Sequence, residues 1–137
     1  MRPLSLSGSE PFRRLLVIGS HADDIEIGCG GALLMLTRTI PELEVDWLVL
    51  AAPGERGEEA RASAEAFLSA ASTSHVEIHG FRDGFLPYIG DEVKDLFEIY
   101  KTTNVWPFNP KALTFILVAN AIQLALTIKE LMGLIPE

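Results

Sequence analysis

A short apolar run, Leu15 to Ile18, is followed at once by a cluster of polar residues and glycines over positions 19–31. A continuous apolar run of this length is typical of a strand that is covered on both faces of a parallel sheet. The carboxyl ends of such strands form the edge at which open α/β sheets collect their ligands. The sequence therefore predicts a buried first strand that ends in a functional loop.

Beyond this loop, predicted helices and strands alternate along the chain. Strands that alternate with helices imply right-handed crossovers and a parallel sheet. The predicted class is α/β, with a Rossmann-like, three-layer fold and a mostly parallel sheet. After the first strand we expect helices over 29–39, 58–71 and 91–100, and strands over 45–51 and 75–79.

The composition changes after Lys101. Positions 112–128 carry no charged residue, and an apolar helix is expected from about Lys111 to Met132, after a break at 104–110 that contains two prolines. A helix that is apolar nearly all round is either buried or spans a membrane. This uncharged stretch is at the lower limit of length for a span, with polar Asn120 and Gln123 near its middle, so we expect no span.

Length and charge limit the classes of protein to which the chain can belong. Its 137 residues suit a single domain over 1–137, with an α/β portion over 13–101 and a divergent apolar tail over 102–137. The formal net charge of -8 argues against nucleic acid as a partner. One cysteine, Cys29, can form no internal disulfide, and the first twelve residues lack a signal-peptide core, so we expect a cytoplasmic protein.

The loop predicted after the first strand holds His21, Asp23 and Asp24. Zinc binds neutral imidazole and carboxylate groups, and catalytic sites use three protein ligands and a water. His21 and Asp24 would supply two of these ligands. Asp23, between them, would face the water and accept its proton as a general base.

Two other interpretations fit the same segment. The aspartates can cap the following helix, with His21 as an ordinary hydrogen-bonding residue. The glycines at 28, 30 and 31 are expected to expose amides at the start of that helix, as in a small nucleotide-binding or methyl-transfer domain. However, Leu33 stands where the third glycine of the G-x-G-x-x-G pattern belongs.

Three segments carry a resemblance to a known family. Ser20-His21-Ala22-Asp23-Asp24 resembles the A-H-P-D-D signature of the LmbE-like, PIG-L-type N-deacetylases, with Ala22 in place of the proline. Gly54-Glu55-Arg56 with Glu59 is similar to the family's G-x-R-x-x-E segment, and residues 80–87 resemble its g-f-x-D-G-x-L-p turn. The resemblance extends over residues 13–101.

What this resemblance implies is a zinc-dependent hydrolase that removes the N-acetyl group from an N-acetylglucosamine-type sugar or its conjugate. By position, His21 and Asp24 would bind zinc (Zn2+), Asp23 would activate the metal-bound water, and Arg56 and Asp83 would contact the substrate. The implied partner is a small-molecule N-acetylated amino sugar or glycoconjugate. A homo-oligomer is left open.

The chain departs from the family in its second half. The family takes its third zinc ligand from an H-x-x-H segment there, and this chain has no histidine after His79. His79 and Cys29 are the substitutes that the sequence offers. The alternative interpretation is a catalytically incomplete fragment of the family, truncated or frame-shifted after about residue 101, that acts as a metal-binding or interaction module.

Overall fold

The described part of the chain folds around one parallel sheet flanked by helices. The computed structural model describes residues 13–102 and 114–118. The four strands pair in parallel in the order β3-β2-β1-β4, so the predicted α/β, Rossmann-like fold is confirmed. The elements are β1 (Arg14–His21), α1 (Asp24–Thr39), β2 (Glu44–Ala51), α2 (Glu55–Phe67), β3 (Thr73–Ile78), the 3-10 helix η1 (Leu86–Tyr88), α3 (Gly90–Thr102) and β4 (Thr114–Val118).

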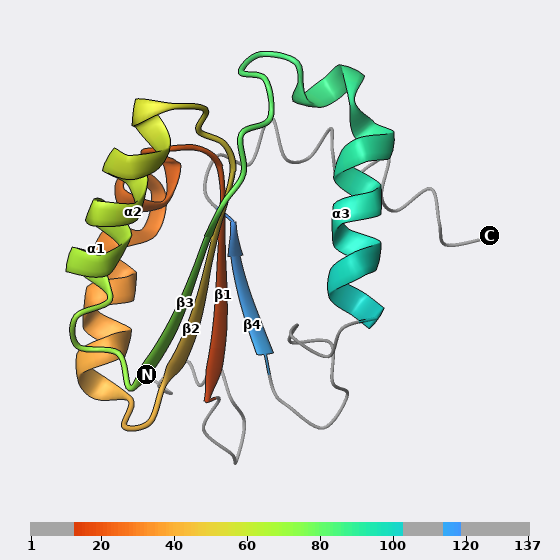
Figure 1. The fold of residues 1–137 in the computed structure, drawn as a ribbon. Helices are drawn as coiled ribbons and strands as arrows, with labels where there is room; N and C mark the ends of the chain where they lie inside the picture. The colour runs from red at the N-terminus through yellow and green to blue at the C-terminus, as the bar shows by residue number, and fades with distance from the viewer. Residues whose placement is uncertain (1–12, 103–113, 119–137) are drawn as a thin grey trace, which may run out of the picture.

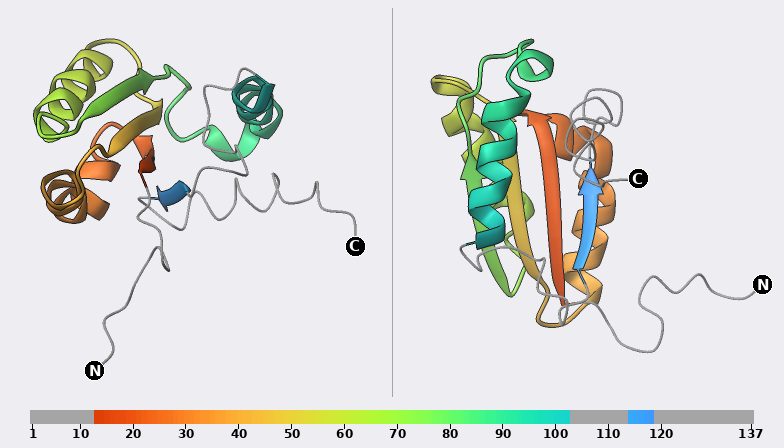
Figure 2. Two further views of the ribbon diagram at one scale, coloured as in Figure 1. Left: turned by 90° about the horizontal axis from the view of Figure 1, so that it is seen from below. Right: turned by 90° about the vertical axis from the view of Figure 1, so that its right-hand side faces the viewer.

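The helices lie on both faces of the sheet. Helices α1 and α2 cover one face and α3 covers the other (Figure 1), and the two further views show the same three layers (Figure 2). From β1 the sheet extends in one direction through β2 and β3 and in the other direction to β4. The strand order therefore reverses between β1 and β4, and open α/β sheets bind ligands at the carboxyl edge of such a point. His21 is the last residue of β1.

Two apolar clusters hold the three layers together. Successive residues of a strand point to opposite faces of the sheet, so each central strand contributes to both clusters. This is why β1 and β2 are apolar along most of their length. The cluster beneath α1 and α2 includes Leu15, Val17, Leu33, Trp47 and Val49, and the cluster beneath α3 includes Leu16, Ile18, Leu48, Leu50 and Val93.

Helix α1 begins at Asp24, earlier than the predicted start at residue 29. The glycines at 28, 30 and 31 therefore lie within the helix, and the expectation that they form its start is wrong. Glycine is unfavourable inside a helix, which led to the late prediction. Packing compensates for this cost: Ile25 is fully buried, and a Cβ at Gly30 would lie only 2.7 Å from Cε1 of Phe67 in α2. Gly30 thus allows α1 and α2 to approach closely.

The predicted apolar helix from Lys111 to Met132 is wrong for residues 114–118. These residues form β4, which pairs with β1 from Arg14 to Ile18. Their sequence, Thr-Phe-Ile-Leu-Val, is rich in residues that favour strands, and pairing with a buried neighbour decides between strand and helix for so short an apolar run. The rest of the predicted helix lies outside the described residues. Within the described part of the chain, no helix has the length and apolar character that crossing a membrane requires.

Candidate functional site

The turn between β1 and α1 brings His21 and Asp24 together. Ala22 and Asp23 form this turn, and Asp24 is the first residue of α1. The backbone N–H of His21 donates to Asp24 Oδ2 at 2.9 Å, and Nδ1 of the imidazole lies 3.4 Å from the same oxygen. The side chains of His21 and Asp24 are 22% and 12% exposed. An imidazole and a carboxylate thus share one focal point at the carboxyl edge of β1.

Gly19 permits this tight turn. A Cβ at this position would lie 3.0 Å from Cγ1 of Ile25 and 3.1 Å from the carbonyl oxygen of His21. A larger residue would therefore require the side chain of Ile25 and the backbone of His21 to shift by a few tenths of an ångström. The placement of Asp24 beside His21 depends on this close approach.

A second set of contacts reaches His21 from the loop after β3. Nε2 of His21 lies 3.0 Å from Asp83 Oδ1, and Nη1 of Arg56 donates to Asp83 Oδ2 at 3.4 Å. Asp83 belongs to the turn predicted at 82–84, where Gly84 has a φ of 73°, in the left-handed region that favours glycine. Arg56 lies in the first turn of α2. Three segments that are distant in sequence therefore meet at His21.

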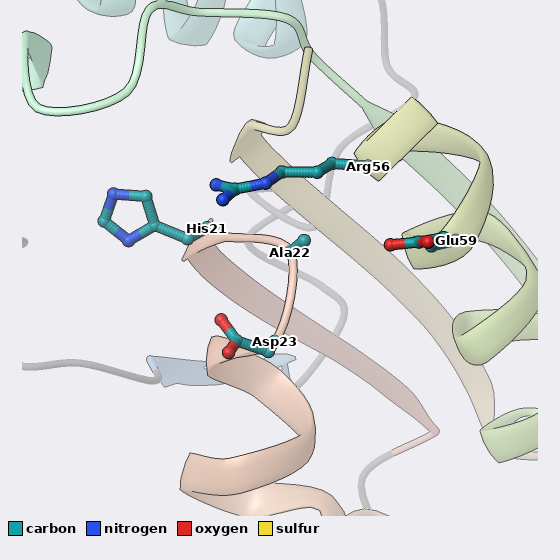
Figure 3. A pocket seen from close by; sticks show the side chains of 5 residues that line it. All are labelled: His21, Ala22, Asp23, Arg56 and Glu59. Carbon is teal, nitrogen blue, oxygen red and sulfur yellow. The ribbon is translucent and has the colours of Figure 1, made fainter. Parts of the chain in front are cut away.

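A pocket of about 270 Å³ opens beside these contacts. In Figure 3 the guanidinium of Arg56 extends toward His21, while Asp23 lies at the start of α1 and Glu59 projects from α2. The volume is close to the lower end of the range for small-molecule sites, about 300 Å³. The pocket is lined by His21, Ala22, Asp23, Arg56 and Glu59.

Glu59 was part of a recognised motif but was not expected as a site residue. It lies three positions after Arg56, and this spacing places both side chains on the same face of α2. Arg56 pairs with Asp83. Glu59 instead lines the pocket.

His21 and Asp24 fit zinc as a pair of ligands. Zinc bonds of about 2.1 Å to nitrogen and oxygen, at a tetrahedral angle, place the two ligand atoms roughly 3.4 Å apart. The observed separation of Nδ1 and Oδ2 is 3.4 Å. Over residues 13–102 and 114–118, no group of three His, Cys, Asp or Glu side chains is placed to hold a metal ion. The described residues thus provide two ligands of the usual three.

The other two histidines and the cysteine lie in different surroundings. Nε2 of His79 is 3.0 Å from Glu77 Oε1, and His75 is 3.9 Å from Asp46 near the opposite end of the sheet. Cys29 is partly buried against the core beneath α1. Burial raises the pKa of its thiol and so disfavours the thiolate that binds zinc. None of these side chains joins His21 in the described part of the chain.

Comparison with known proteins finds a likeness to solved structures. No family model matches the chain, and no curated protein matches it. Among solved structures, the chain is similar to N,N'-diacetylchitobiose deacetylase from Pyrococcus horikoshii in complex with its inhibitor, with 24% sequence identity and a TM-score of 0.49. The match covers 65% of this chain and 37% of that one. The chain therefore spans little more than a third of that enzyme's length.

Proposed function

We propose that this chain is a zinc-dependent hydrolase that removes the N-acetyl group from an N-acetylglucosamine-type sugar or a conjugate of one. The observation that supports this most strongly is the separation of 3.4 Å between His21 Nδ1 and Asp24 Oδ2, beside a pocket lined by Asp23. The motifs add support. Residues 20–24, 54–59 and 80–87, which each resemble a segment of the N-deacetylases, meet at this pocket or at His21.

His21 and Asp24 are the proposed zinc ligands. When bound between them, zinc would polarise the acetyl carbonyl and lower the pKa of a water held beside it. The third ligand would come from a group other than these two. The task of the chain's own residues is to place the ion, the water and the acetyl group next to one another.

Asp23 is the proposed general base. Its side chain is exposed and lines the pocket, and within the described residues its carboxylate has no hydrogen-bond or ion-pair partner. It would accept a proton as the water oxygen bonds to the acetyl carbon. When the carbon–nitrogen bond breaks, the same proton would pass to the departing amine, leaving acetate and a free amino sugar.

Arg56 and Asp83 are the proposed substrate contacts, together with Glu59. The guanidinium donates and the carboxylates accept hydrogen bonds, which suits the hydroxyl groups of a sugar. The pocket lining combines two carboxylates, Asp23 and Glu59, with one guanidinium. This balance favours a neutral, hydroxyl-rich ligand over a polyanion.

A second candidate is a catalytically incomplete fragment that binds metal without turnover. The observation that favours it is the presence of only two arranged metal ligands among the described residues. The two candidates differ in one property, the release of acetate.

The test is an acetate assay on the full 137-residue chain. We expect acetate release from N-acetylglucosamine or its β-1,4-linked dimer, loss of this release after chelation, and recovery on addition of zinc. Addition of magnesium serves as the control, since a pair of one imidazole nitrogen and one carboxylate oxygen favours zinc over magnesium. Zinc binding with no acetate release from these sugars or from an N-acetylglucosamine conjugate would contradict the proposed hydrolase and support the incomplete fragment.

A further inference from the structure

We propose that Asp83 positions His21 for metal binding by holding the proton of the neutral imidazole on Nε2. This leaves the lone pair of Nδ1 directed toward Asp24. The inference rests on the metal site of the proposed function, and gives Asp83 a task beyond contact with a substrate.

The first argument is the position of two carboxylates at opposite ends of one ring. A neutral imidazole carries a single proton, on Nδ1 or on Nε2. Asp83 Oδ1 lies 3.0 Å from Nε2, within the range of a hydrogen bond. Asp24 Oδ2 lies 3.4 Å from Nδ1, beyond the usual range, and already accepts the backbone N–H of His21 at 2.9 Å. For the neutral ring, these distances favour the proton on Nε2.

The second argument is that Asp83 is itself held in place. Arg56 makes a long contact of 3.4 Å with its other oxygen, Oδ2, while Oδ1 faces His21. The backbone of the turn is closed by a hydrogen bond from the N–H of Phe85 to the carbonyl of Arg82 at 3.1 Å. With Gly84 in the left-handed region, this turn fixes the direction in which Asp83 projects.

The third argument comes from the chemistry of metal-binding histidines. Such residues nearly always donate their second ring N–H to a carboxylate, a carbonyl or a water, and this partner sets the tautomer and the orientation of the ring. Loss of the partner typically lowers metal affinity about 10- to 100-fold. With the proton on Nε2, Nδ1 and Asp24 Oδ2 form the donor pair whose 3.4 Å separation matches zinc. Asp83 would thus be a positioning residue, with no direct bond to the metal.

The experiment compares wild type with Asp83→Ala, using Asp91→Ala as the matched control. Asp91 is an exposed carboxylate at the start of α3. Nitrogen-15 NMR of the metal-free protein, at a pH high enough to keep the imidazole neutral, reports the tautomer of His21, whose signals are assigned by their loss in His21→Ala. We expect the Nε2–H tautomer in wild type and in the control, and a mixture of tautomers in Asp83→Ala. Competition with a chromophoric chelator should show zinc affinity about 10- to 100-fold lower in Asp83→Ala alone.

Two results would overturn the inference: an Nδ1–H tautomer in the wild type, or equal zinc affinity in wild type and Asp83→Ala. Neither measurement uses a sugar substrate, so the outcome is independent of turnover. A chain that releases no acetate but shows both effects would retain the role of Asp83 and lose the deacetylase. A chain that releases acetate with His21 in the Nδ1–H form would retain the deacetylase function and lose the proposed role of Asp83.

Discussion

Replacing Asp23 with asparagine is expected to lower kcat for acetate release by about 100- to 10,000-fold, the usual contribution of a general base. The amide of asparagine has the shape of the carboxylate but cannot accept the proton of the attacking water. Zinc binding should persist, because His21 and Asp24 are unchanged. The fold should persist as well, because the side chain of Asp23 is exposed. Steady-state kinetics on the zinc-loaded protein, together with its zinc content, measures both parts of this prediction.

Asp91→Asn is the control for the Asp23 substitution. It makes the same chemical change at an exposed position on α3 and should leave kcat unaltered. Wild-type kcat in Asp23→Asn would remove Asp23 from the mechanism. Loss of zinc in this variant would assign Asp23 to the metal site instead.

Trp47→Ala is expected to lower the free energy of unfolding by about 3–5 kcal/mol, the typical cost of removing a large buried aromatic side chain. Trp47 is 1% exposed, and the centroid of its ring lies 6.1 Å from the ring centroid of Phe67. It belongs to the cluster that joins the sheet to α1 and α2, which carry Asp24 and Arg56. Among the described residues Nε1 of Trp47 has no hydrogen-bond partner, so the cost arises from the cavity. The same loss of packing should also weaken zinc binding at the site, because it loosens the helices that carry Asp24 and Arg56.

Urea unfolding followed by circular dichroism measures this change, with Tyr88→Ala as the control. Tyr88 is 81% exposed, and its removal should change stability by no more than about 0.5 kcal/mol. Trp47→Phe should fall between the two variants, because the phenyl ring fills part of the cavity. Equal stabilities for Trp47→Ala and Tyr88→Ala would show that the cluster beneath α1 and α2 does not hold the layers together.

The central strands β1 and β2 were the most predictable part of the fold. β1 and β2 are buried on both faces along most of their length, so most of their residues are apolar and the pattern is plain in the sequence. The start of α1 was less predictable, since the close contact between Gly30 and Phe67 that offsets a helical glycine arises only after the helices pack. β4 was missed because a five-residue apolar run has no periodicity that separates strand from helix.

The contacts of the site were likewise predictable only in part. The proximity of His21 and Asp24 was predictable, because a short turn after a strand brings residues three apart to one point. The contact between His21 and Asp83 was not, since it depends on how the loop after β3 folds back over the edge of the sheet. The motif around Asp83 indicated a functional turn without indicating its partner. Only the fold shows that the three motif segments meet.

The central claim is that the imidazole of His21 and the carboxylate of Asp24 hold a zinc ion at the end of β1. The most direct measurement is the zinc content of the purified 137-residue chain after exhaustive dialysis, beside that of His21→Ala. We expect one zinc ion per chain in the wild type and none in the variant. Equal zinc in the two proteins, or none in the wild type, would contradict the account.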